Sequence, residues 1–153
     1  MRWLEHRIPP PLVFALIGVA MWLVRGVTVP IPMNALARGS VAGLLALVGI
    51  ALGVAGATAF RRAHTTIDPH RPEQVSSLVV DGIYRVTRNP MYLGLAAMLL
   101  AWAVYLAAPV AFAGPLLFVL YITRFQIVPE ERTLAARFGP AYAAYRQRVR
   151  RWL

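Results

Sequence analysis

The sequence predicts an all-α integral membrane protein: a bundle of about four transmembrane helices plus a C-terminal amphipathic interfacial helical segment. Three observations support this fold class. Apolar residues make up 59% of the 153 residues and charged residues only 14%, whereas soluble domains carry about 25% charged residues. The apolar residues gather in four stretches of roughly bilayer length. The tail that follows has the three-to-four-residue spacing of an amphipathic helix.

Four segments approach the roughly 20 residues that a helix needs to cross a bilayer. They comprise residues 11–29, 40–60, 91–108 and 110–128. Because only Pro109 separates the third segment from the fourth, we expect those two to form an antiparallel hairpin. Pro115 predicts a kink within the fourth segment. We expect a single domain, with two transmembrane helices in residues 1–60 and the functional core in residues 61–153.

The second segment is rich in glycine and carries no charge. Its glycines, together with one just before it, are Gly39, Gly43, Gly49, Gly53 and Gly56. Small residues four positions apart allow two helix backbones to approach closely in a membrane. The spacing therefore fits a helix-packing face, and an ordinary glycine-rich membrane helix is the alternative.

All 16 basic residues are arginine, and the formal net charge is +10. Such a charge could indicate nucleic acid binding, but the arginines flank apolar stretches, so we expect a bilayer partner and no nucleic acid. Each arginine gains roughly 1 kcal/mol beside anionic headgroups. They precede the first segment, follow the fourth, and fill the connection between the second and third. The positive-inside rule then places both termini and that connection in the cytoplasm, and we expect a bacterial inner membrane.

The C-terminal tail, residues 129–153, is too polar for a membrane span. Its apolar residues are Leu134, Phe138, Tyr142, Tyr145, Val149 and Trp152. Gly139 and Pro140 divide the tail into two helices, with the proline suited to the first turn of the second helix. The apolar face should pack on the bundle or the lipid. An interfacial anchor and a lid over a site both fit this pattern.

A metal site is not expected. The chain has no cysteine, which excludes disulfides, thiolate ligands and cysteine nucleophiles. His64, Asp68 and His70 lie close together in the connection between the second and third segments. Their spacing matches no helical or zinc pattern, so hydrogen bonding within the loop is the expected role.

Two polar clusters border the hairpin. Arg88, Asn89 and Tyr92 lie at the start of the third segment, where free N–H groups and the helix dipole favour an anionic ligand group. Glu130 and Glu131 follow the fourth segment and repel each other. Either nearby arginines or a bound ligand with an ammonium group and hydroxyls would offset them. Because the hairpin is antiparallel, both clusters should converge on one pocket at the membrane interface.

These clusters contain a pattern that resembles the isoprenylcysteine carboxyl methyltransferase and phospholipid methyltransferase superfamily. Its first half reads Gly82-Ile83-Tyr84-Arg85-x-x-Arg88-Asn89-Pro90-x-Tyr92-x-Gly94. Its second half reads Glu130-Glu131-x-x-Leu134-x-x-x-Phe138-Gly139-x-x-Tyr142-x-x-Tyr145. The resemblance covers about residues 65–152. It implies a membrane-embedded methyltransferase that uses S-adenosylmethionine and acts on a lipophilic acceptor, such as an isoprenoid carboxylate, a phospholipid amine or a small hydrophobic molecule.

The resemblance also implies roles for single residues. Those that would line the cofactor are Asn89, Pro90, Tyr92, Leu93 and Gly94. Glu130 and Glu131 would contact its polar groups, and Tyr84 and Arg88 would support the loop. Candidates on the substrate side are Arg124, Tyr142 and Tyr145. No residue is assigned as catalytic, because methyl transfer is an in-line displacement whose main needs are alignment and the exclusion of water.

Asn89 departs from the superfamily pattern, which has histidine at this position. Asparagine can form hydrogen bonds but cannot titrate near neutral pH, so it cannot act as a general base. Two other functions remain open. One is an NADPH-dependent membrane lipid or sterol reductase, whose members have a similar C-terminal half but are usually longer. The other is a non-catalytic membrane protein that retains the fold.

Overall fold

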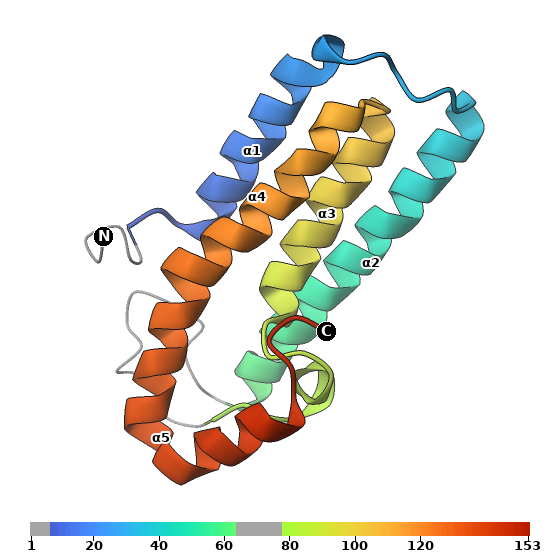
Figure 1. Ribbon diagram of the computed structural model, residues 1–153. Helices are drawn as coiled ribbons and strands as arrows, with labels where there is room; N and C mark the ends of the chain where they lie inside the picture. Colours follow the sequence, from blue (N-terminus) through green and yellow to red (C-terminus); the bar gives the residue numbers. More distant parts are fainter. Residues whose placement is uncertain (1–6, 64–77) are drawn as a thin grey trace.

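The structure is a computed structural model, and it describes residues 7–63 and 78–153. In these two stretches every regular element is helical, which confirms the predicted all-α class. Four helices run along a bundle: α1 (Pro10–Val24), α2 (Ala35–Arg62), α3 (Pro90–Leu106) and α4 (Ala113–Ile122) (Figure 1). A fifth helix, α5 (Val128–Arg148), continues the line of α4 and then turns across one end of the bundle.

Short turns of other helical types connect these helices. Three are 3₁₀ turns, at Arg25–Val27, Gly82–Arg85 and Pro109–Phe112. A π-helical turn, Thr123–Ile127, joins α4 to α5. A π-helical turn inserts one extra residue into an α-helix, and such turns often lie near functional sites. Here the π-helical turn directly precedes the two glutamates of the predicted site.

The helix ends differ from the predicted ones for local reasons. α1 ends at Val24, five residues early, where the Arg25 guanidinium donates to the Trp22 carbonyl at 2.7 Å and lies over the indole ring. α2 begins at Ala35 because the Asn34 side chain accepts a hydrogen bond from Ala37 N–H at 2.7 Å. Pro115 lies in the first turn of α4. Its missing N–H costs no intrahelical hydrogen bond there.

The outer surface of the bundle is apolar, as expected for a bilayer environment. Three helical stretches are long and apolar enough to cross a membrane: Pro10–Val27, Ala35–Arg62 and part of Pro109–Arg148. α3 has 17 residues, which is the lower limit for a span. Large apolar side chains are exposed along the bundle, including Leu16, Leu44 and Leu120. The protein is therefore an integral membrane protein, and it is built as the predicted four-helix bundle.

The segment after α1 and the turn between α3 and α4 contact each other at the end of the bundle opposite the C-terminus (Figure 1). The Ile31 N–H donates to the Ala107 carbonyl at 2.7 Å, which links the segment after α1 to the turn between α3 and α4. α3 and α4 form the predicted antiparallel hairpin (Figure 1). Consequently the start of α3 and the beginning of α5 lie at the same end of the bundle.

α2 and α3 pack through glycine, which decides between the two interpretations of the glycine-rich segment. A Cβ atom on Gly49 would lie 2.7 Å from the Gly94 carbonyl oxygen, and a Cβ on Gly94 would lie 2.5 Å from the Gly49 carbonyl oxygen. A Cβ on Gly56 would lie 2.7 Å from Met91 Cγ. Side chains at these positions would push the backbones apart. Part of the glycine pattern is thus a helix-packing face.

Gly49 and Gly53 offer a matched test of this packing, since a Cβ on Gly53 meets nothing within 4 Å. We expect Gly49→Ala to destabilise the protein by about 1–3 kcal/mol, because the overpacked interface must open. Gly53→Ala should be neutral or stabilising by up to about 1 kcal/mol, since alanine favours a helix. Thermal unfolding of both variants in detergent measures the difference. Equal melting temperatures would contradict the packing described here.

The C-terminal tail divides as predicted. Gly139 has φ 45° and ψ −119°, a conformation that glycine adopts readily, and it separates the two helical parts of α5. Tyr142, Tyr145 and Val149 are buried on one face. They pack with Leu78, Val80, Leu134 and Phe138. The apolar face of the tail therefore covers the segment that precedes α3 and does not point into lipid.

Candidate functional site

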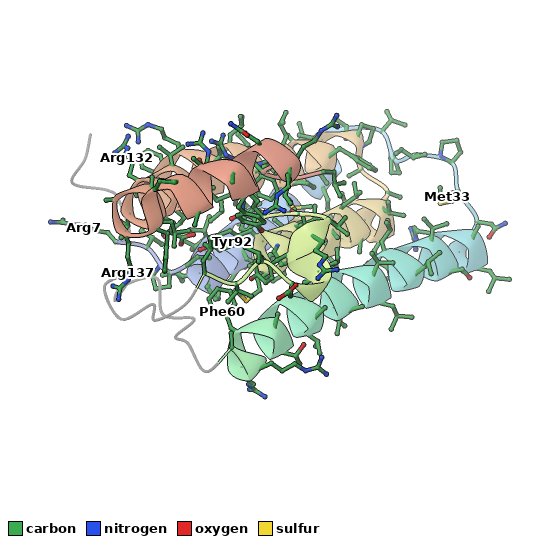
Figure 2. The ribbon with its side chains drawn as sticks, turned by 90° about the horizontal axis from the view of Figure 1, so that it is seen from below. Arg7, Met33, Phe60, Tyr92, Arg132 and Arg137 are labelled. Atoms are coloured by element: carbon green, nitrogen blue, oxygen red, sulfur yellow. The ribbon has the colours of Figure 1, made fainter. Side chains whose placement is uncertain are left out.

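The site lies where the start of α3, the beginning of α5 and the C-terminus meet (Figure 1). Seen from this end, Tyr92 lies near the middle of the molecule, whereas Arg132 and Arg137 lie at its periphery on α5 (Figure 2). Both arginines are exposed. Their positions agree with the predicted amphipathic tail, whose basic face points away from the bundle.

Glu130 forms the first polar contact of the site. It follows the last apolar turn of the fourth span, and the Tyr92 hydroxyl donates to its Oε1 at 2.6 Å. Burial raises the pKa of the Glu130 carboxyl to about 7, an effect that the Tyr92 hydrogen bond opposes and the neighbouring Glu131 charge reinforces. Glu130 therefore changes its charge close to neutral pH.

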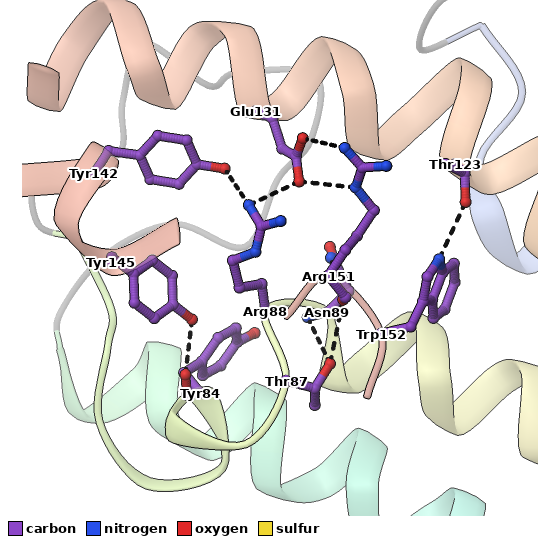
Figure 3. A network of polar contacts seen from close by, with 10 residues as sticks. All are labelled: Tyr84, Thr87, Arg88, Asn89, Thr123, Glu131, Tyr142, Tyr145, Arg151 and Trp152. Carbon is purple, nitrogen blue, oxygen red and sulfur yellow. Dashed lines mark hydrogen bonds and ion pairs between the residues drawn. The ribbon is translucent and has the colours of Figure 1, made fainter. Parts of the chain in front are cut away.

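Glu131 is the centre of a second, larger network (Figure 3). Arg88 Nη1 lies 2.9 Å from Glu131 Oε1, and the side chains of both residues are about nine-tenths buried, at 10% and 11% exposure. Arg151 binds the same carboxylate with two groups: Nε donates to Oε1 at 3.0 Å and Nη2 donates to Oε2 at 2.7 Å. Of the two situations predicted for the glutamates, the structure therefore shows pairing with arginine for Glu131.

Tyrosines from α5 hold the loop in front of α3. Arg88 Nη1 donates to the Tyr142 hydroxyl at 3.2 Å, and the Tyr145 hydroxyl donates to the Tyr84 carbonyl at 2.8 Å. The buried Tyr84 ring also packs edge-on against Phe60 of α2, with ring centroids 5.5 Å apart. Burial raises the pKa of Tyr145, so its hydroxyl keeps its proton and stays a donor.

Asn89 lies between α3 and the end of the chain. Its Nδ2 donates to the Arg151 carbonyl at 2.9 Å, and its N–H donates to Thr87 Oγ1 at 3.2 Å. The Asn89 carbonyl accepts the Leu93 N–H at 2.9 Å in the first turn of α3. The residue that replaces the superfamily histidine therefore contacts the backbone of the C-terminus.

Four predicted residues lie outside this polar network, and one of them, Leu93, is half-buried in the first turn of α3, where its N–H donates to the Asn89 carbonyl. Pro90 and Gly94 are buried against α2, where Pro90 Cγ faces Gly56 and Gly94 faces Gly49. Arg124 is exposed on the π-helical turn, with its guanidinium over the Phe125 ring. The structure thus brings together Tyr84, Arg88, Asn89, Tyr92, Glu130, Glu131, Tyr142 and Tyr145.

Sequence reasoning missed Arg151 and Thr87. Arg151 belongs to a run of arginines that looked like part of the basic face of the tail. Its half-buried position next to Trp152 follows from the backbone leaving the helix at Val149, which has extended φ and ψ values. A signal was available: the apolar period continues through Val149 and Trp152, so the intervening arginines could not all face water.

The site holds no cluster that would bind a metal ion, within the part of the chain that the structure describes. His64, Asp68 and His70, the histidine-rich group of the long connection, lie outside the described residues. The chemistry offered by the described site is that of carboxylates, guanidinium groups and phenols. These groups suit a ligand that carries both positive and negative charge together with hydroxyls.

Comparisons with known proteins agree with this picture. The family model for phospholipid methyltransferase matches residues 37–141. An uncharacterized protein of Haemophilus influenzae is 48% identical over 63 residues, which are 41% of this chain and 100% of that protein. Methanethiol S-methyltransferase 2 of Bradyrhizobium diazoefficiens is 41% identical over 70 residues, 44% of this chain and 25% of that enzyme. No solved structure matches the chain.

The family match extends from the first turn of α2 to the second part of α5. It therefore includes the glycine interface, the start of α3 and both glutamates. Because the matched residues make up more than half of the chain, this membrane protein belongs to the phospholipid methyltransferase family and is a methyltransferase.

Proposed function

We propose that the protein transfers a methyl group from S-adenosylmethionine to a lipophilic acceptor at this end of the bundle. One observation carries the proposal. A carboxylate that titrates near neutrality, Glu130, lies next to a buried carboxylate held by two guanidinium groups, those of Arg88 and Arg151. A zwitterionic ligand with hydroxyls needs such a mixed set of donors and acceptors.

The residues fit the chemistry of S-adenosylmethionine. Among the described residues, Arg88 Nε is buried without a hydrogen-bond partner, so it is available to an anionic group such as the amino-acid carboxylate. Glu130 suits the ammonium group or the ribose hydroxyls. The ring of Tyr92 is the aromatic group proposed to face the sulfonium. The positive end of the α3 dipole lies on the same side and favours the carboxylate.

The remaining assignments rest on the superfamily resemblance. Asn89, Pro90, Tyr92, Leu93 and Gly94 would line the cofactor. Pro90 and Gly94 pack against α2. Their role would therefore be to fix the position of the backbone in the first turn of α3. Tyr84 would support the loop through its ring and its carbonyl.

The acceptor would enter from the lipid. Tyr142 and Tyr145 belong to the network, and Arg124 lies on the exposed side of the π-helical turn, where it could meet a polar headgroup. Phospholipid amines, isoprenoid carboxylates and small hydrophobic molecules, including thiols of the methanethiol kind named for the Bradyrhizobium relative, are the candidate classes. The arginine distribution supports a site on the cytoplasmic side of the membrane, which is the side where S-adenosylmethionine is made. The membrane itself would be a bacterial inner membrane.

When bound, S-adenosylmethionine would supply an electrophilic methyl group. The protein's residues hold and align the reacting groups and exclude water. No protein nucleophile is needed for such a displacement. Asn89 does not titrate near neutrality, so it does not act as a general base.

A transfer assay tests the proposal. Purified protein in detergent is incubated with methyl-labelled S-adenosylmethionine and a panel of acceptors from the three classes, and the label is measured in the organic extract. We expect enzyme-dependent label in at least one class. Label in none of them, together with spectroscopic binding of NADPH, would favour the reductase instead.

Ligand binding should depend on pH through Glu130. Its ionised form is the one that accepts hydrogen bonds from an ammonium group, and its pKa is raised to about 7. Affinity for S-adenosylhomocysteine should therefore increase with pH, by up to about tenfold per unit below that pKa, and then level off. Calorimetric titrations between pH 5.5 and pH 8.5 (a range of roughly 1.5 units on either side of the pKa) measure this. Glu130→Gln should flatten the profile, and an unchanged profile in that variant would assign the titration to another group.

A further inference from the structure

The last residues of the chain close over the loop that precedes α3. We call Arg150–Trp152 the clasp. The Arg88 N–H donates to the Arg150 carbonyl at 3.0 Å, and the Thr87 hydroxyl donates to the Arg151 carbonyl at 3.3 Å. Thr87 is fully buried. The clasp therefore adds main-chain hydrogen bonds that seal the loop from one side (Figure 3).

The clasp is also tied to α3 and to the π-helical turn. Asn89 Nδ2 donates to the Arg151 carbonyl at 2.9 Å. The Trp152 indole N–H donates to Thr123 Oγ1 at 3.2 Å, and the indole packs against the core of the bundle. The contacts of the Arg151 carbonyl with Asn89 and of Trp152 with Thr123 restrain the backbone at Arg151. The Cα atom from which the Arg151 side chain extends is therefore held in place.

That side chain reaches Glu131. A carboxylate offers about four acceptor positions. Arg88 and Arg151 fill two of them on Oε1, and Arg151 fills one on Oε2. Within residues 7–63 and 78–153 no further donor contacts Glu131, so one position on Oε2 is left for a donor from a ligand. The bidentate contact from Arg151 sets the plane of the carboxylate and hence the direction of that position.

We propose that Arg151 is a positioning residue: held in the clasp by Asn89, it orients the Glu131 carboxylate toward the ligand of the methyltransferase site. The inference rests on the proposed binding of S-adenosylmethionine. It also gives Asn89 a role that needs no titration, since the Asn89 side chain fixes the backbone from which Arg151 extends.

Variants of the 153-residue chain in detergent test this role. Arg151→Gln removes the charge and the bidentate contact, and Arg151→Lys keeps only the charge. Arg148→Gln is the control, because Arg148 is exposed at the end of α5 and lies outside the clasp. The readouts are the calorimetric Kd for S-adenosylhomocysteine, the division of effects between KM and kcat, and the indole NMR signal of Trp152, identified with Trp152→Phe.

We expect Arg151→Gln to weaken S-adenosylhomocysteine binding about tenfold to a hundredfold, the range for a misplaced binding group. Arg151→Lys should recover only part of this loss, while Arg148→Gln should match the wild type. The Trp152 signal should stay in place in Arg151→Lys, which shows that the clasp is still closed. Asn89→Leu should shift that signal and weaken binding in the same direction as Arg151→Gln.

The outcomes separate this role from the proposed function. If the wild-type protein fails to bind S-adenosylhomocysteine, the proposed function falls and the role of Arg151 falls with it. If the wild type binds and Arg151→Gln binds equally well, only the role of Arg151 is overturned. Should Arg151→Gln not fold, Arg151→Lys decides, and wild-type affinity in that variant would overturn positioning by the bidentate contact.

Discussion

Glu131→Ala is expected to cause the largest loss of stability of any single substitution in the site. Without the carboxylate, the guanidinium groups of Arg88 and Arg151 face each other with no counter-charge, and Arg88 is nine-tenths buried. Removing one partner of a buried ion pair costs about 3–5 kcal/mol. Thermal unfolding in detergent should therefore show a large drop in Tm, and the folded fraction should no longer bind S-adenosylhomocysteine.

Asp81→Ala is the matched control. Asp81 also pairs with an arginine at 2.7 Å, but Arg85 and Asp81 are 75% and 78% exposed. An exposed pair contributes about 0–1 kcal/mol. The two acidic residues therefore differ in burial and in the number of arginines that pair with them. Similar Tm values for Glu131→Ala and Asp81→Ala would contradict the buried network as a source of stability.

Glu130→Ala is expected to weaken ligand binding strongly with little effect on folding. Among the described residues, Glu130 accepts a hydrogen bond from Tyr92, whereas Glu131 pairs with both Arg88 and Arg151. A hydrogen bond to a charged group contributes about 1.5–3 kcal/mol, so the Kd for S-adenosylmethionine should increase about tenfold to a hundredfold. Calorimetry on purified protein at matched expression measures the change.

Tyr92→Phe separates orientation from contact. It removes the hydroxyl that holds Glu130 and keeps the ring, so the Kd should increase by less, up to about tenfold. If Tyr92 acts through Glu130, the double variant should bind about as weakly as Glu130→Ala alone. Additive effects would show that Tyr92 contacts the ligand by itself, and unaltered affinity in both single variants would reject the site.

Much of the fold could be predicted because membrane helices follow simple physical rules. Apolar length located the four helices of the bundle, and the single proline between the third and fourth required a hairpin. The convergence of Tyr92 with Glu130 and of Arg88 with Glu131 follows from that hairpin. The division of the tail at Gly139 follows from the left-handed conformation that glycine favours.

Other features depend on contacts that a sequence does not display. The early end of α1 results from Arg25 turning back on Trp22. The π-helical turn has no proline or glycine to mark it. Arg151 looks like any other arginine of a basic tail until the backbone leaves α5 and returns over Thr87. These features arise from tertiary packing, which spacing along the chain reports only indirectly.

Calorimetric titration of the purified protein with S-adenosylmethionine and S-adenosylhomocysteine is the most direct test of cofactor binding at this site. We expect saturable binding of both ligands at one site per chain, with affinity that increases with pH toward 7 and is weakened by Glu130→Ala and Arg151→Gln. A well-folded protein that binds neither ligand would contradict it.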